Sequence, residues 1–291
     1  MMTNNQWWSN ETIAVVTGGN KGIGLEIVSQ LAKNGVTTIL TARNVDRGQL
    51  AVDQLRAKGL PNVAFHQLDV TDSKSIENLA VWIKQQHGGL DILINNAGII
   101  SYFHKDKKQG AMDVVATNYY GVKKVTKSLL PLIRPSEAFG RIINVSSRTG
   151  QLQVLRSQEL KEVVSAEMLI ESVIDSFVEN FLADVSTGQI ISKGWPIIEG
   201  RGPEAYSDYS VSKIALNAYT RVLAGELMSR ADGPKISVNA ICPGYTNTDM
   251  SLGLGKKTVG EGADTAVWLA LLPPSELPCG KFLAERAEVP F

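Results

Sequence analysis

The sequence has few of the residues that build disulfide frameworks or metal sites. Among 291 residues there are two cysteines, Cys242 and Cys279, and three scattered histidines. Two cysteines cannot form a disulfide framework and are typical of a reducing compartment. The histidines lack the spacing of metal ligands. We therefore expect a protein that folds without disulfides and holds no metal.

Long apolar runs and secretory features are also absent. No run approaches the length of a membrane span, and the first residues lack the charged region and apolar core of a secretory signal. These absences predict a cytoplasmic protein without a membrane partner.

Charge of one sign is not in excess. Lys and Arg together number 29, Asp and Glu together number 29, and the formal net charge is +0 at pH 7. This balance argues against nucleic acid as a partner. With 44% hydrophobic and 20% charged residues, the composition is that of a soluble globular protein. We expect residues 1–291 to form a single domain.

Short apolar runs rich in β-branched residues alternate with longer segments of helical spacing. The predicted strands are residues 13–16, 37–41, 63–67, 92–95, 142–145 and 237–240. The predicted helices are residues 24–34, 47–58, 73–87, 112–132 and 210–229. This alternation predicts an α/β fold, a doubly wound parallel sheet of the Rossmann-like kind with helices on both faces.

One stretch interrupts the alternation, because no strand-like run occurs between residues 145 and 237. Residues 159–185 are amphipathic instead, with Leu169, Val173, Phe177 and Phe181 at successive i, i+4 positions. The pattern predicts a helix buried along one stripe. We interpret residues 151–206 as a helical flap insertion that covers either the site or a surface on which copies of the chain would otherwise associate.

The first strand runs directly into a glycine-rich turn at residues 17–24, where the spacing is G-x-x-x-G-x-G. A strand that enters such a turn and leaves as a helix holds the phosphates of a dinucleotide, because glycine allows close approach and the helix start offers free amides. We expect cofactor contacts from six residues of this turn: Gly18, Asn20, Lys21, Gly22, Ile23 and Gly24.

The residues after the second strand distinguish the two dinucleotides. An NAD site usually places an acid here to bind the ribose 2′-hydroxyl, but residues 36–44 contain none. Arg43 stands just past the strand, and Lys21 lies within the glycine-rich turn. Two cations without a carboxylate favour a 2′-phosphate, and therefore NADPH.

Reactive side chains are expected at the carboxyl ends of the strands, where ligands of such sheets bind. Ser147 follows the strand at 142–145, and Tyr209 and Lys213 share one face of a later helix. A nearby ammonium lowers a phenol pKa of about 10 towards neutrality. Tyr209 would then protonate a carbonyl oxygen as hydride reaches the carbon, while Ser147 holds that oxygen.

The same tyrosine–lysine spacing occurs twice more, at Tyr119 with Lys123 and at Tyr120 with Lys124. These pairs follow Asn118 within a predicted helix and do not stand at the end of a strand. We predict that they lie on a solvated helix surface.

Six motifs occur together and in order: residues 17–24, 95–98, 118, 144–147 and 209–213, and the pair at 243 and 244. This set resembles the short-chain dehydrogenase/reductase family over nearly the whole chain. The form of the glycine-rich turn and the long gap between Ser147 and Tyr209 resemble the monomeric carbonyl reductases and the plant menthone (neomenthol) and salutaridine reductases.

The resemblance implies a role for each matching residue. Tyr209 would be the acid/base, Ser147 would orient the substrate oxygen, and Lys213 would bind the nicotinamide ribose. Asn118 would hold a water that links Lys213 to solvent. The further cofactor contacts that it implies are Asp69 and Val70 at the adenine, Asn95, Ala97 and Gly98 along the crevice, and Pro243, Gly244, Thr246 and Thr248, with Thr248 at the carboxamide.

The function implied is reduction of a bulky hydrophobic ketone, of terpenoid or alkaloid type, by NADPH. Reduction of a C=C or C=N bond remains an alternative, as does a non-catalytic NADP(H)-binding sensor. The family's flap covers helices that otherwise form tetramers, so a monomer is expected. The candidate substrate residues are Ile100, Tyr102, Arg148, Trp195, Tyr206 and Tyr245.

Overall fold

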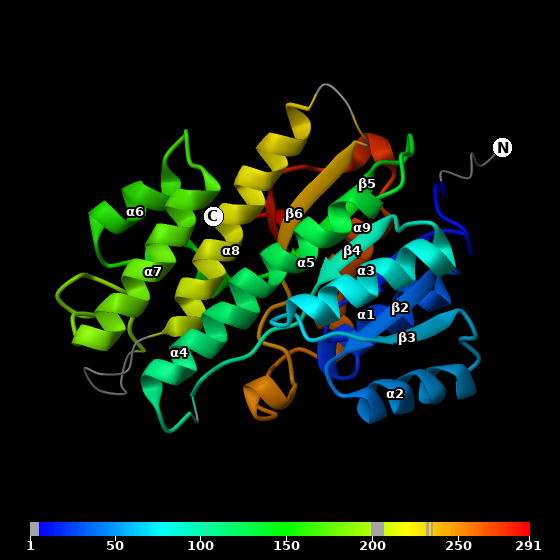
Figure 1. Cartoon of the computed structure of the whole chain (residues 1–291), viewed down its shortest axis with the longest axis horizontal. Coiled ribbons are helices and arrows are strands. Elements are labelled where there is room, and N and C mark those ends of the chain that lie inside the picture. The colour runs from blue at the N-terminus through cyan, green and yellow to red at the C-terminus, as the bar shows by residue number, and fades with distance from the viewer. Residues whose placement is uncertain (1–5, 103, 199–206, 231–232, 234) are drawn as a thin grey trace.

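The computed structural model describes residues 6–102, 104–198, 207–230, 233 and 235–291, which fold around one eight-stranded sheet (Figure 1). The strands are β1 (Ile13–Val16), β2 (Thr37–Ala42), β3 (Val63–Gln67), β4 (Ile92–Asn95), β5 (Gly140–Val145), β6 (Ile236–Cys242), β7 (Phe282–Ala284) and β8 (Ala287–Glu288). Their order is β3-β2-β1-β4-β5-β6-β7-β8, and every neighbouring pair is parallel except β7 with β8. The predicted fold class is therefore confirmed.

Nine α-helices surround this sheet in the described part of the chain. They are α1 (Gly22–Lys33), α2 (Val45–Ala57), α3 (Ser73–His87), α4 (Lys107–Val115), α5 (Val122–Leu129), α6 (Gln158–Ser165), α7 (Glu171–Thr187), α8 (Asp208–Met228) and α9 (Val259–Leu271). Alternate side chains of β1 enter opposite cores, as strand geometry requires. Ala14 and Val16 pack with α1, α2 and α9, whereas Ile13 and Val15 pack with α3, α5 and α8.

The structure corrects several predicted elements. Strands β7 and β8 and helix α9 were not predicted, since the two strands are too short to show a period. The predicted helix 112–132 begins earlier, because the Asp106 side chain accepts hydrogen bonds from the backbone amides of Lys108 and Gln109. It also contains a π-helical turn, Ala116–Gly121, between α4 and α5.

The amphipathic stretch 159–185 forms two helices, α6 and α7, where one was expected. The reason is a tertiary contact from α8. The Arg221 guanidinium donates hydrogen bonds to the carbonyl oxygens of Val164 (2.9 Å) and Ala166 (3.2 Å), which satisfies the end of α6. Helices α6 and α7 lie outside α8 and α4, at one end of the molecule (Figure 1).

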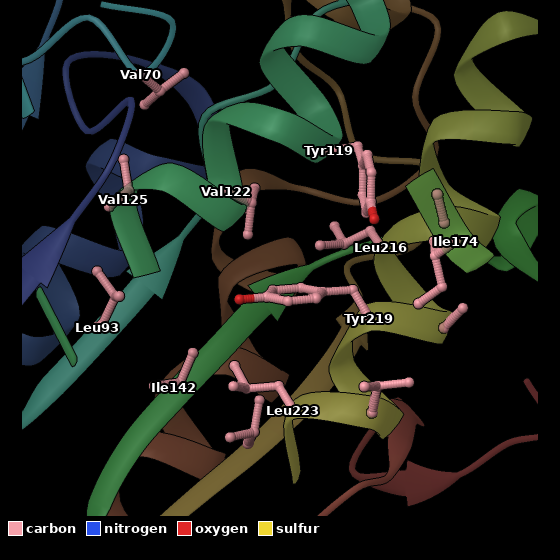
Figure 2. Close-up of a cluster of buried hydrophobic side chains, with 14 of the residues drawn as sticks. Val70, Leu93, Tyr119, Val122, Val125, Ile142, Ile174, Leu216, Tyr219 and Leu223 are labelled. Carbon is pink, nitrogen blue, oxygen red and sulfur yellow. The ribbon is translucent and has the colours of Figure 1, made fainter. Parts of the chain in front are cut away.

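Helix α7 turns an apolar stripe towards α8, as predicted, but Val173 of the predicted stripe is 37% exposed and Ile174 is buried in its place. Ile174, Phe177 and Phe181 are buried there. Figure 2 shows Ile174 in one buried cluster with Tyr119 and Tyr219. Helix α7 is thus joined to the main core by ordinary apolar packing.

The prediction that Tyr119 and Lys123 are solvated is wrong, because α7 covers them. Both side chains are buried. The Tyr119 hydroxyl donates to Asp175 Oδ1 at 2.8 Å, and Lys123 Nζ pairs with both Asp175 and Glu171 of α7. This group of four side chains ties α7 to α5 and the π-helical turn.

Replacing Asp175 should weaken this connection. In Asp175→Ala the buried Tyr119 hydroxyl loses its acceptor and Lys123 loses one of its carboxylates. We expect the free energy of unfolding to fall by about 1–3 kcal/mol, measured by urea denaturation. As a control, Glu77→Ala removes only the exposed pair with Lys74 and should change stability by less than about 0.5 kcal/mol. Equal effects of the two variants would contradict the buried role of Asp175.

Candidate active site

The glycine-rich turn is held tightly between β1 and the chain that follows β4. Gly18 has φ +64, and a Cβ there would lie 2.9 Å from Ala97 Cα. A Cβ on Gly24 would lie 2.4 Å from both Asn96 Nδ2 and Gly18 O. Larger residues do not fit at these two positions, so the turn keeps its backbone close to the crevice.

Asn96, which the sequence analysis missed, organises this turn. Its side-chain amide donates to the carbonyl oxygens of Thr17 (2.9 Å) and Gly18 (3.2 Å). The Thr17 hydroxyl oxygen in turn accepts from the backbone amides of Asn96 and Ala97. The doublet Asn95–Asn96 was visible in the sequence, but only the direction of each side chain shows which one faces the turn.

Asn95 differs from the expectation that it would lie against the cofactor. Its side chain is buried and donates to Thr126 Oγ1 at 3.0 Å and to Asn144 Oδ1 at 2.9 Å. Asn95 therefore links β4 to α5 and β5 inside the molecule.

The start of α1 is suited to a phosphate. Lys21 at the N-cap makes no side-chain cap bond, and the first turn holds no acid, so the amides there keep donors for an anion. Lys21 and Arg43 are exposed beside this turn, and Asn20 and Ile23 are partly buried in it. Lys21 lowers the pKa of Asp249, and Arg47, a further cation that sequence reasoning missed, lies close enough to contribute.

The segment after β6 lies against the same turn. A Cβ on Gly22 would come within 3.3 Å of Thr248 Cγ2, and Lys21 Nζ pairs with Asp249 at 2.7 Å. Thr246 is buried, and its hydroxyl donates to the carbonyl oxygens of Pro243 and Gly244. Thr248 thus lies beside the start of α1, whereas Thr246 supports the loop that follows β6.

The expected adenine residues follow β3. The Asp69 carboxylate accepts from the backbone amide and the hydroxyl of Thr71, at 2.9 and 2.7 Å. Val70 is buried, and a Cβ on Gly121 would lie 2.9 Å from its Cγ2. Both residues stand at the same edge of the sheet as the glycine-rich turn, because β3 and β1 run in parallel with β2 between them.

Ser147, Tyr209 and Lys213 meet beyond the end of β5. Tyr209 and Lys213 lie in the first two turns of α8, which Ser207 caps by accepting from the Ser210 amide. Lys213 Nζ donates to the Val145 carbonyl oxygen at 2.8 Å and lies 5.4 Å from the centroid of the Tyr209 ring. Ser147 lies close enough to Tyr209 to act on the pKa of its hydroxyl.

The electrostatics of these groups differ from the sequence expectation. Burial raises the pKa of Tyr209 above its ordinary value of 10.0, although the nearby Ser147 hydroxyl opposes the increase. Burial lowers the pKa of Lys213 to about 8. The effect of desolvation on the Tyr209 pKa is therefore larger than that of the Lys213 ammonium, which is directed at the Val145 carbonyl oxygen. Without cofactor, the phenol stays protonated.

Asn118 stands on the π-helical turn, next to Gly98 and Lys213. Its side-chain oxygen accepts from the Ile99 amide at 2.9 Å, and its amide donates to Ile99 O and Ser212 Oγ. A Cβ on Gly98 would lie 3.4 Å from Asn118 Oδ1 and 3.7 Å from Lys213 Nζ. The two polar side chains thus approach each other across a position that has no side chain.

Cys242, at the end of β6, is a second residue that sequence reasoning missed at this site. Its buried Sγ accepts from the backbone amides of Arg148 (3.2 Å) and Gly244 (3.4 Å). Cys242 also lies close enough to Tyr209 and Lys213 to influence the pKa of each. The sulfur therefore joins the loop of Ser147 to the loop that follows β6.

The structure places the six candidate substrate residues in different surroundings. Ile100 is partly buried, Tyr245 is exposed, and Tyr102 is close enough to Tyr209 to act on its pKa. Arg148 is exposed and pairs with Glu285 of the β7–β8 turn at 3.5 Å. Tyr206 lies outside the described residues.

Trp195 does not line the candidate site. It is fully buried between Phe177 and Phe181, with ring centroids at 4.9 and 5.2 Å, and its Nε1 donates to Asp184 at 2.8 Å. The expectation of a substrate contact is wrong, since this tryptophan forms the core of the flap.

A dinucleotide-binding sheet that carries a serine, a tyrosine and a lysine at one edge defines a class of oxidoreductases. Residues 12–158 and 170–258 match the family described as short chain dehydrogenase. The chain belongs to this family, which confirms the predicted resemblance and the prediction of an oxidoreductase that acts on C=O or CH–OH groups. The unmatched residues between the two ranges cover most of α6 and the turn before α7.

Individual relatives agree with the predicted subgroup. A carbonyl reductase of Homo sapiens, whose name specifies NADPH, is 41% identical over 94% of this chain and 96% of its own length. The structure of salutaridine reductase from Papaver somniferum is 37% identical, with a TM-score of 0.84, over 94% of this chain and 99% of that chain. Menthone neomenthol reductase from Mentha piperita is 34% identical, with a TM-score of 0.78, over 94% and 98%.

No helix among the described residues has the length and apolar character needed to cross a bilayer.

The lowered pKa of Lys213 predicts a pH dependence of stability. The folded pKa is about 8 and the ordinary value is 10.5, so between these values the unfolded chain binds a proton that the folded chain does not. The free energy of unfolding of the cofactor-free protein should therefore rise with pH across this window, relative to Lys213→Met. Urea denaturation of both proteins at several pH values measures the difference. A difference that stays constant with pH would contradict the burial of a titrating lysine.

Proposed function

We propose that this protein reduces the carbonyl group of a bulky hydrophobic ketone with NADPH, and that Tyr209 donates the proton. The observation that carries the proposal is the proximity of Ser147, Tyr209 and Lys213 at the edge of the sheet that also holds the start of α1. A binding module would need the helix start but none of these three side chains.

The residues around the glycine-rich turn and the start of α1 fit NADPH. Bound there, the coenzyme supplies a hydride and carries a 2′-phosphate. The amides at the start of α1 would hold the pyrophosphate, and Lys21, Arg43 and Arg47 would surround the 2′-phosphate. The NADPH in the name of the human relative supports the same coenzyme.

The raised pKa of Tyr209 is consistent with a proton donor. At neutral pH its hydroxyl keeps its proton, which is the form needed to protonate a carbonyl oxygen. Ser147 would hold the same oxygen with its own hydroxyl and orient the carbon towards the coenzyme. Lys213 would bind the ribose, and Asn118 would connect Lys213 to solvent through a water.

Apolar and aromatic side chains suit a hydrophobic substrate. Ile100, Tyr102 and Tyr245 stand near the end of the sheet where Tyr209 lies. The names of the two plant relatives, salutaridine reductase and menthone neomenthol reductase, also point to bulky cyclic ketones. The exposed pairing of Arg148 with Glu285 makes an acidic substrate less suitable.

We further propose a cytoplasmic monomer in which residues 1–291 form one domain and residues 151–206 form a flap. The support is the cover that α7 gives to Tyr119 and Lys123 on the outer side of α5. Association through this surface would require the flap to leave its buried contacts.

Tyr209→Phe tests the chemistry. The variant keeps the ring but loses the proton, so turnover of a terpenoid ketone should fall by about a hundredfold or more, while NADPH affinity stays unchanged. Loss of absorbance at 340 nm and NADPH fluorescence titration measure the two quantities. Tyr120→Phe, which alters a tyrosine with the same lysine spacing, should leave both unchanged. Full activity of Tyr209→Phe, or activity only on C=C or C=N bonds, would refute ketone protonation by this residue.

Arg43→Glu tests the coenzyme. A carboxylate at this position repels the 2′-phosphate and can bind the 2′-hydroxyl of NADH, so the ratio of kcat/KM for NADPH to that for NADH should fall by about tenfold or more, equivalent to about 1.4 kcal/mol. Lys58→Glu makes the same charge reversal at the other end of α2 and should not alter the ratio. Similar ratios for wild type and Arg43→Glu would overturn the assignment of Arg43.

A further inference from the structure

The residue before the candidate proton donor, Asp208, is a buried carboxyl group that the proposed reaction does not use. Its side chain is 2% exposed. The Ser101 hydroxyl donates to Oδ2, and the Tyr209 backbone amide donates to Oδ1 at 2.6 Å. Asp208 thus connects the start of α8 to the loop that follows β4.

Ser101 lies between Ile100 and Tyr102, which we assign to the wall of the substrate site. Asn118 holds the preceding Ile99 through two hydrogen bonds, at 2.9 and 3.0 Å. The loop is therefore held at two points, Ile99 and Ser101. At Ser101 the contact is with Asp208, the residue that precedes Tyr209 in the chain.

The loop also packs closely against α4, which limits its positions. The Ser101 carbonyl oxygen accepts from the His104 amide at 2.7 Å, and a Cβ on Gly110 would lie 2.9 Å from Ser101 Cβ. A small rotation about Ser101 would move Tyr102 relative to Tyr209.

Burial of this carboxyl group is unfavourable by itself. Burial raises the pKa of Asp208, and the hydrogen bond from Ser101 is the strongest influence that opposes the increase, followed by the Tyr209 amide and the charge of Lys107. An acid in the first turn of a helix also interacts favourably with the helix dipole. That interaction does not require burial or contact with a loop, since Glu159 in the first turn of α6 is exposed.

We propose, on the basis of the function proposed above, that Asp208 is a positioning residue that sets the wall at residues 99–102 against Tyr209 through Ser101, and so determines selectivity for bulky ketones. A large ketone touches the wall and needs it in place for its carbonyl oxygen to reach Tyr209. A compact diketone reaches Tyr209 without the wall.

The experiment compares Asp208→Ala, Ser101→Ala and the double variant with a bulky cyclic ketone (menthone) and a compact one (butane-2,3-dione). In each single variant KM for menthone should rise about tenfold, whereas kcat for either substrate and KM for butane-2,3-dione should change less than twofold. The double variant should match the single variants, because both remove one contact. Asp208→Asn, whose amide still bonds Ser101, should restore most of the menthone KM.

Equal losses on both substrates, additive effects in the double variant, or no effect would overturn the proposal. Glu159→Ala, which removes a first-turn acid from α6, is the control and should change neither KM. Should Asp208→Ala fail to fold, Ser101→Ala tests the same contact.

Amide hydrogen exchange separates this proposal from the proposed function. Residues 99–102 should exchange about tenfold faster in Asp208→Ala than in wild type, with α8 unchanged and no ketone present. Absence of ketone turnover in wild type would refute the proposed function alone. Unchanged exchange in the loop would refute the role of Asp208, whatever the substrate.

Discussion

The hydrogen bond from Lys213 Nζ to the carbonyl oxygen of Val145 holds the start of helix α8 against the end of strand β5. Tyr209 lies one turn before Lys213, and Ser147 follows Val145 by two residues. A single contact therefore brings together three side chains from distant parts of the chain. Most of α8 is buried between the sheet and α7, so a reacting carbonyl would meet groups that this packing already holds in place.

Burial gives the site its electrostatic character. The pKa of Tyr209 and that of Asp208 are raised, and the pKa of Lys213 is lowered, each mainly by desolvation. All three groups are thus shifted towards their neutral forms. A neutral phenol in a poorly solvated site is a suitable proton donor, and a coenzyme that carries several charges would alter this balance when it binds.

The sequence predicted the sheet well because its signals are local. β1, β3, β4 and α3 begin and end where the periodicity placed them, since β-branched runs and caps such as Asp72 act within a few residues. The prediction from sequence failed where a residue far away in the chain decides how an element ends or which side chains are buried. Arg221 ends α6, the flap buries Tyr119, and Trp195 packs within the flap although its aromatic character suggested a substrate contact.

The amino-acid sequence by itself determined the α/β class, the glycine-rich turn, the missing acid after β2 and the identities of Ser147, Tyr209 and Lys213, because each depends on residue type and spacing. The tertiary structure alone decided that Asn96 and not Asn95 holds the turn, that Cys242 joins two loops, and that Asp208 reaches Ser101. The direction of a side chain, and the solvent removed from around it, depend on neighbours that are far away in the sequence.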